Sequence, residues 1–140
     1  MEAPDMDAIK RAEDALADLQ GDMQKWLQEE LTRLDAAQAG HTANPNDAES
    51  RANLYAVAHD LKGLGATYGF PLVGRVAGSQ CEMMTGLGKT KPLPASLTKA
   101  HVDTIHAMVN GKITSETDET GIALCTELEH QVANELARNV

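Results

Sequence analysis

The stretch AHDLKGLGATYGF, residues 58–70, places a single histidine in a helical pattern rich in small residues. At about 100° per residue, five apolar residues share one stripe of this helix: Leu54, Val57, Ala58, Leu61 and Leu64. His59 falls roughly 140° from Leu54, on the side expected to face solvent. The pattern therefore predicts an amphipathic helix that packs on a core through one face and presents His59 on the other.

The expected neighbours of His59 on the solvent side are mostly small: Ala52, Tyr55, Ala56, Lys62, Gly63 and Ala66. A glycine inside a helix costs about 1 kcal/mol relative to alanine, so Gly63 calls for a compensating reason, and access to the imidazole is the simplest one. Lys62 places an ammonium where it could pair with a phosphoryl group on His59. A neutral imidazole nitrogen is a good phosphoryl acceptor near pH 7.

These residues resemble the signature of the histidine-containing phosphotransfer (HPt) family, His-x-x-Lys-Gly followed six residues later by Gly. His59, Lys62, Gly63 and Gly69 match that signature. The resemblance implies an all-α fold, an antiparallel four-helix bundle that presents the histidine on one helix. It also implies that His59 carries a phosphoryl group, that Lys62 is its electrostatic partner, that Gly63 clears the approach and that Gly69 ends the histidine helix.

The resemblance further implies the partners of such a carrier. Response-regulator receiver domains would exchange the phosphoryl group with His59, and a hybrid or cognate histidine kinase would act upstream. The receiver would supply Mg²⁺, so the chain is expected to hold no cofactor or metal of its own. We expect the carrier to be a monomer. Since 140 residues leave no room for a nucleotide-binding domain, we also expect it to have no kinase activity of its own.

One position departs from the family pattern. Gln80 lies on the apolar stripe of the next helix, where a buried glutamine could orient His59 by hydrogen bonding. Relatives in the family often carry a helping glutamine one position later, where this chain has Cys81.

Composition narrows the possible partners. The formal net charge is −9, with 12 Lys and Arg against 21 Asp and Glu, which disfavours a nucleic-acid partner. No segment approaches the ~20 apolar residues of a membrane span. Cys81 and Cys125 show no metal-ligand spacing and are expected to be reduced thiols, as in a cytoplasmic protein.

The helical period and its breaks predict a single domain over residues 1–140. A long additional helix is expected over 1–39, capped by Asp5. A bundle is expected over 47–138, with the histidine helix at about 47–68 capped by Asn46 or Asp47. The remaining breaks predict a loop over 40–46 that leaves His41 solvated, and helices that start near Pro71, Ser96 and Ser115. Because aromatic residues make up only 3% of the chain, Met83, Met84 and Met108 are interpreted as core packing.

Two other interpretations of the histidine motif stay open. His-Asp-Leu-Lys also begins the motif of histidine-kinase dimerisation helices, although these usually continue with Thr or Asn and then Pro rather than with Gly63 and Leu64. The chain could instead be a helical interaction module, in which His59 is silent and the small-residue face docks a partner helix. The Glu-x-x-His spacing at Glu127 and His130 lacks the second copy that a di-iron bundle needs.

Overall fold

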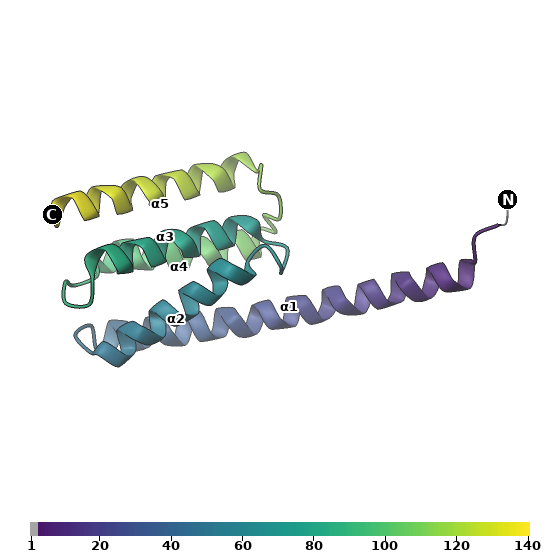
Figure 1. Ribbon diagram of the computed structural model, residues 1–140, viewed down its shortest axis with the longest axis horizontal. Helices are drawn as coiled ribbons and strands as arrows, with labels where there is room; N and C mark the ends of the chain where they lie inside the picture. The colour runs from purple at the N-terminus through teal and green to yellow at the C-terminus, as the bar shows by residue number, and fades with distance from the viewer. Residues whose placement is uncertain (1–2) are drawn as a thin grey trace.

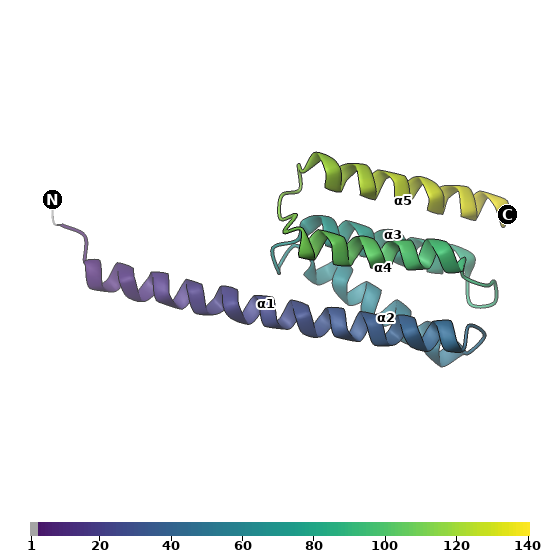
Figure 2. The ribbon, with the colours of Figure 1, turned by 180° about the vertical axis from the view of Figure 1, so that it is seen from behind.

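Five α-helices and no strand make up residues 3–140, the part of the chain that the computed structural model describes. The helices are α1 (Met6–Ala43), α2 (Ala48–Leu64), α3 (Pro71–Leu87), α4 (Ala95–Asn110) and α5 (Glu119–Arg138). Successive helices run in opposite directions, and the two ribbon views show α5 on one side, α3 and α4 in the middle, and α1 with α2 on the other side (Figures 1 and 2). The predicted all-α class is confirmed; residues 1 and 2 of the predicted domain lie outside the described residues.

The C-terminal half of α1 is part of the bundle. Contacts join α1 to α2, α2 to α3, α3 to α4 and α4 back to α1, while α5 packs on α3 and α4. Leu27, Leu31 and Leu34 bring α1 into the core because their spacing of four and three residues places them on one face of the helix. The prediction that residues 47–138 form the bundle with the first helix as an addition is therefore wrong. The ring of four helices is α1 to α4, and α5 is the helix added to it.

The N-terminal half of α1 extends away from the bundle. Every residue from 9 to 22 is exposed, and in Figures 1 and 2 this half projects as a straight rod beyond the other helices. Half of the longest helix thus contributes nothing to the core of its own chain.

Carboxylates cap three of the helices. Asp5 and Asp47 accept hydrogen bonds from backbone N–H groups at the starts of α1 and α2, as predicted. In α5 the cap is Asp118 rather than Ser115, because the Asp118 carboxylate accepts the N–H of Gly121 at 2.8 Å. The fifth helix therefore starts later than the sequence suggested.

The end of α1 corrects a second prediction. The helix continues through residues 40–43, and the backbone N–H of Asn44 donates to the carbonyl of Gly40 at 3.1 Å. His41 is buried in this last turn and is not solvated in a loop. Burial lowers the pKa of His41, and the positive charge of Arg51 lowers it further.

The histidine helix α2 ends at Leu64, earlier than the predicted end near residue 68, and Gly69 closes the turn that follows it. The chain after Leu64 makes one more turn, and Gly69 then adopts a φ of +89°, which favours glycine. The N–H of Phe70 donates to the carbonyl of Gly65 at 2.8 Å, and that of Gly69 to the carbonyl of Ala66 at 3.0 Å. This pair of bonds is the Schellman arrangement that satisfies the last carbonyls of a helix.

The backbones of α2 and α3 touch at two glycines. A Cβ atom on Gly65 would lie 2.5 Å from the backbone nitrogen of Gly74 and 2.8 Å from its Cα. A Cβ on Gly74 would lie 3.2 Å from the carbonyl oxygen of Lys62. The start of α3 therefore lies directly against the end of the histidine helix.

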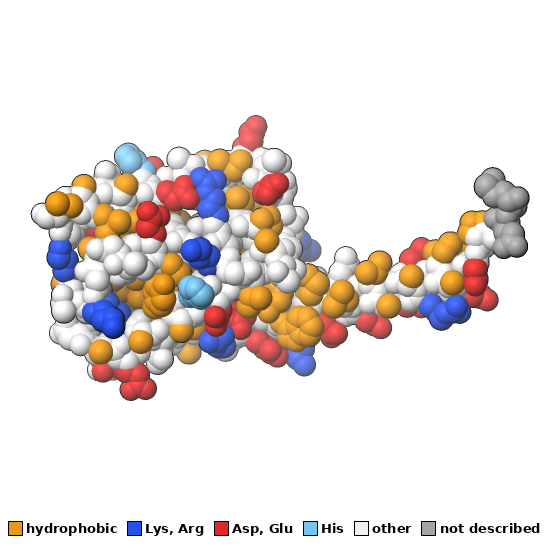
Figure 3. Space-filling model, viewed as in Figure 1, with side chains coloured by type: hydrophobic (Ala, Val, Ile, Leu, Met, Phe, Trp, Pro, Cys, Tyr) orange, Lys and Arg blue, Asp and Glu red, His pale blue; other side chains and the backbone are white. Residues whose placement is uncertain are grey.

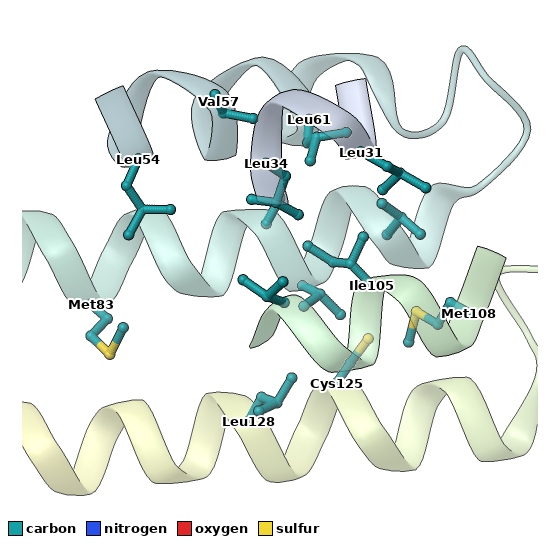
Figure 4. Packing of buried hydrophobic residues seen from close by; sticks show 14 of the residues in the cluster. Leu31, Leu34, Leu54, Val57, Leu61, Met83, Ile105, Met108, Cys125 and Leu128 are labelled. Carbon is teal, nitrogen blue, oxygen red and sulfur yellow. The ribbon is translucent and has the colours of Figure 1, made fainter. Parts of the chain in front are cut away.

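Aliphatic and sulfur-containing side chains fill the core between the helices. Leu54, Leu61, Met83 and Ile105 are fully buried, and Figure 4 shows them pointing into one continuous cluster. The predicted packing role of Met83, Met84 and Met108 is confirmed, since all three are buried in this cluster.

One histidine is enclosed in the core. The imidazole of His101 is fully buried; its Nδ1 lies 2.8 Å from the carbonyl of Leu97, and its Nε2 lies 2.9 Å from the hydroxyl of Ser79. Since a carbonyl only accepts, Nδ1–H donates to Leu97, and the neutral ring then accepts the Ser79 proton at Nε2. Burial lowers the pKa of His101.

We expect Gly65→Ala to destabilise the protein by about 2 kcal/mol or more, because the new methyl group would meet backbone atoms that move only with α3. The matched control is Gly63→Ala, two residues earlier, where a Cβ would meet no atom within 4 Å. This control should leave stability unchanged or raise it by up to ~1 kcal/mol. Denaturant unfolding measures both, and equal effects of the two changes would contradict the close contact.

The lowered pKa of His101 predicts a loss of stability in acid. Below the ordinary histidine pKa of 6.5, the unfolded chain binds a proton at His101 that the folded protein still excludes. This group therefore makes stability fall as pH drops below about 6.5 and adds no pH dependence well above that value. The slope should reach at most ~1.4 kcal/mol per pH unit for each such proton, with His41 adding to it.

Unfolding of the wild type and of His101→Gln, followed at pH values from 7 down to 5, tests this expectation. His101→Gln should show a shallower acid slope, whereas the exposed control His130→Gln should keep the wild-type slope. Identical slopes for all three proteins would show that His101 is not the group responsible.

Candidate functional site

The histidine of α2 faces solvent. Leu54, Val57, Ala58 and Leu61 of the same helix are buried, while His59 is exposed, as the helical period predicts. The His59 and Tyr55 rings lie with centroids 6.0 Å apart and planes inclined by 33°. Within residues 3–140 the imidazole of His59 takes part in no hydrogen bond, unlike that of His101 or His106. Both of its nitrogens are free to meet an incoming group.

The predicted neighbours of His59 share its face. All six are exposed: Ala52, Tyr55, Ala56, Lys62, Gly63 and Ala66. A Cβ atom on Gly63 would have no other atom within 4 Å, so the space above this residue is open. The helix surface beside the imidazole is therefore open to an approaching partner at Gly63.

Lys62 reaches over α3. A Cβ on Gly78 would lie 3.6 Å from Cγ of Lys62 and 3.7 Å from its Cδ, so the lysine stem rests on a position that has no side chain. Lys62 forms no ion pair among residues 3–140. The carboxylate of Asp60 lies 3.3 Å from the guanidinium of Arg33, which already has Glu30 at 2.9 Å. A free ammonium is thus available one turn from His59.

The expected hydrogen bond between Gln80 and His59 is not formed. Gln80 is fully buried, and neither Nε2 nor Oε1 of its amide has a hydrogen-bond partner in the described chain. The stripe of α3 that carries Gln80 faces the core, while His59 leaves α2 on the solvent side. The orienting role considered for Gln80 is therefore wrong in this geometry.

Two grooves lie along the boundary between α2 and α3. One, with a volume of about 720 Å³, is lined by Arg51, Ala52, Tyr55, Met84 and Lys89 among others. The second, of about 700 Å³, is lined among others by Tyr55, Lys62, Gly74, Gly78 and Cys81. Tyr55 borders both grooves, so the exposed face around His59 continues onto α3.

The contribution of α3 to this face was not predicted from the sequence. Gly74 and Gly78 lie four residues apart, on one side of the helix, and both meet Lys62. That spacing was the available signal, because two glycines one turn apart in a helix indicate a close approach by another chain segment.

The two cysteines are free and buried. Burial raises the pKa of the Cys81 thiol, and the positive charge of Lys62 acts in the opposite direction. Burial likewise raises the pKa of Cys125.

Basic side chains are spread over the face formed by α2 and α3. In Figure 3, which has the viewpoint of Figure 1, separate Lys or Arg groups and several Asp or Glu groups surround a histidine on an otherwise uncharged surface. Arg75 is held by Glu129 of α5 through two bonds of 2.9 and 2.6 Å, while Lys62 and Lys89 have no ion-pair partner among the described residues. This face is less acidic than the net charge of −9 would suggest.

No three His, Cys, Asp or Glu side chains of the described chain are grouped in a way that could hold a metal ion. Within the same residues, each helix is too short or too polar to cross a membrane. No family model matches the sequence, and comparison with curated proteins and with solved structures also gave no match.

Proposed function

We propose that this protein is a histidine phosphotransfer protein of a two-component phosphorelay, with His59 as the phosphoryl carrier. One observation carries the proposal: the imidazole is exposed and free of hydrogen bonds, next to open space at Gly63 and one turn from the unpaired ammonium of Lys62. The HPt-like motif at His59, Lys62, Gly63 and Gly69 supports the same conclusion.

The transfer is a displacement at phosphorus. A nitrogen of neutral His59 attacks the phosphoryl group of a receiver's aspartyl phosphate, the bond between phosphorus and the carboxylate oxygen breaks, and the aspartate leaves as a carboxylate. The reverse step delivers the group to the aspartate of a second receiver. By family resemblance, the receiver contributes the Mg²⁺ and the acidic pocket, and this chain contributes the nucleophile and its position.

Lys62 offsets the negative charge that arrives with the phosphoryl group. Because its ammonium is exposed, we expect an effect of only about 0–1 kcal/mol on the phosphorylated state. Gly78 supports this role, since the bare backbone of α3 lets the lysine stem lie flat instead of extending away from the site.

Receiver domains, and a hybrid or cognate histidine kinase acting through one, are the proposed partners. A receiver that brings its aspartate to His59 would lie on the small side chains of Ala52, Ala56 and Ala66 and over the grooves beside Tyr55. In this proposal the chain is a cytoplasmic carrier that takes its phosphoryl group from a partner and not from ATP.

The alternative is a helical interaction module that uses the same face without chemistry. The grooves along α2 and α3 would suit a partner helix whether or not His59 reacts. Only covalent labelling separates this alternative from the proposed carrier.

We expect the wild type to gain a label when mixed with a receiver that carries a ³²P-labelled aspartyl phosphate, and the label to be lost in acid but kept in base. His59→Gln should abolish it without changing the melting midpoint, because an exposed side chain contributes little to stability. His130→Gln, an equally conservative change on α5, should label as the wild type does. A label that persists in His59→Gln, or an unlabelled wild type, would contradict the proposal.

Gly63→Gln tests whether open space beside the imidazole is needed. The longer side chain meets no neighbour in the folded chain, so stability should be equal or up to ~1 kcal/mol higher. Phosphotransfer should nevertheless become slower, because the side chain projects into the space that a receiver would occupy. Single-turnover transfer from a phosphorylated receiver measures this, and full wild-type rates in a well-folded variant would argue against docking on this face.

A further inference from the structure

The rod formed by the first half of α1 carries an apolar stripe that the fold leaves exposed except at Met23, which is half-buried. Ile9, Leu16, Leu19 and Trp26 are 40%, 61%, 46% and 43% exposed. Figure 3 shows hydrophobic side chains in a row along this rod. A helix of such length is marginal in water without packing, and most helices draw their stability from a buried face.

The stripe follows a coiled-coil repeat. Its positions are separated by alternating steps of three and four residues: Ile9, Ala12, Leu16, Leu19, Met23 and Trp26. This stripe differs from the one that enters the bundle core through Leu27, Leu31 and Leu34. The next two positions of the repeat are Glu30 and Arg33, which pair with each other at 2.9 Å. This apolar stripe over residues 9–26, the seam of a coiled coil, therefore ends where the bundle begins.

We infer that the rod binds a second copy of this chain, in an antiparallel two-helix coiled coil over Ile9–Trp26. A twofold axis between residues 17 and 18 aligns the two stripes in full. In this alignment Ile9, Ala12 and Leu16 of one copy lie opposite Trp26, Met23 and Leu19 of the other copy, respectively. This inference does not depend on the phosphotransfer activity, and it replaces the monomer expected from the sequence.

The side-chain sizes favour this orientation over a parallel one. Antiparallel pairing places the smallest seam residue, Ala12, against the long Met23, and the largest, Trp26, against the smaller Ile9. A parallel pair would instead set Ala12 on Ala12, which leaves a void, and Trp26 on Trp26 beside two adjoining bundles. Large seam residues thus lie opposite smaller ones only when the two helices run in opposite directions.

The seam is of modest size. Residues 9–26 span roughly 27 Å at 1.5 Å per residue. Six seam side chains from each copy would bury roughly 1,000 Å² in total, at the low end of specific interfaces. We therefore expect a reversible dimer with a dissociation constant in the micromolar range.

Sedimentation equilibrium of the full chain tests the association. At loading concentrations from about 1 to 300 µM, bracketing the expected dissociation constant, the mass should rise from 15.0 kDa toward twice that value. The double variant Leu16→Glu/Leu19→Glu should stay at 15.0 kDa and lose part of its helical circular dichroism, while its bundle unfolds as in the wild type. The matched control Ala17→Glu/Gln24→Glu adds the same charge on another side of the rod and should dimerise normally.

A wild type that stays at 15.0 kDa throughout this range would overturn the proposal, whether the rod binds another protein or nothing. Equal association of the wild type and Leu16→Glu/Leu19→Glu would overturn it as well, since the contact would then lie elsewhere.

Cross-linking tests the orientation. A mixture of Leu16→Cys and Leu19→Cys proteins should form a disulfide dimer on mild oxidation, because these positions face each other in the antiparallel pair. Neither variant should cross-link efficiently alone. The wild type, whose Cys81 and Cys125 are buried, is the control for background oxidation. Efficient cross-linking of Leu16→Cys with itself would show a parallel pair and overturn the proposed arrangement.

Discussion

The close contact between α2 and α3 determines how the rest of the protein is arranged. At Gly65 and Gly74 the two backbones meet without intervening side chains, so their separation is set by main-chain atoms that have no alternative rotamers. α3 is also the central helix, since it contacts α2, α4 and α5. Any shift at this contact would therefore move the helix that presents His59 relative to the whole core.

The same contact shapes the surface of the site. With α3 so close, the stem of Lys62 crosses onto Gly78 and stays beside α2. A larger residue at position 78 would occupy the space where the methylene groups now lie. The availability of a cation near His59 thus follows from backbone packing several residues away, and not only from the His-x-x-Lys spacing on the helix surface.

Local charge pairing decides which groups remain free near the imidazole. Asp60, the residue after His59, is paired with Arg33 of α1, which also holds Glu30. The carboxylate nearest in sequence is thereby partly neutralised, while Lys62 keeps an unpaired charge. An acidic protein can in this way keep one face less negative than its net charge implies, because screening in salt limits the reach of more distant charges to about 10 Å.

The sequence predicted those features that depend on neighbours along the chain. The apolar period of α2 placed Leu54 and Leu61 in the core and His59 outside it, and Asp5, Asp47 and Gly69 act at helix ends through bonds to residues a few positions away. These features need no knowledge of the tertiary fold, since helical spacing and capping geometry are local.

Features that depend on tertiary contacts were not predictable in the same way. Gly, Asn and Pro around residue 41 favour a loop, yet burial of the His41 ring keeps that turn helical. The buried amide of Gln80 could not be assigned a partner from periodicity, which gives the direction of a side chain but not what it meets. Likewise, apolar stripes alone do not tell which four helices form the ring, so α1 and α5 were exchanged in the predicted arrangement.

The two proposed surfaces, the coiled-coil seam on α1 and the phosphotransfer face on α2, lie on adjacent helices without overlapping. The seam ends at Trp26, and the next two positions of the repeat are the charged residues Glu30 and Arg33, which form an ion pair. Arg33 also pairs with Asp60 of α2. Trp26 and Arg33 are roughly 10 Å apart along the helix axis at 1.5 Å per residue. In an antiparallel pair the two bundles lie at opposite ends of the shared rod. Self-association through α1 would therefore bring two of the proposed phosphotransfer sites into one assembly.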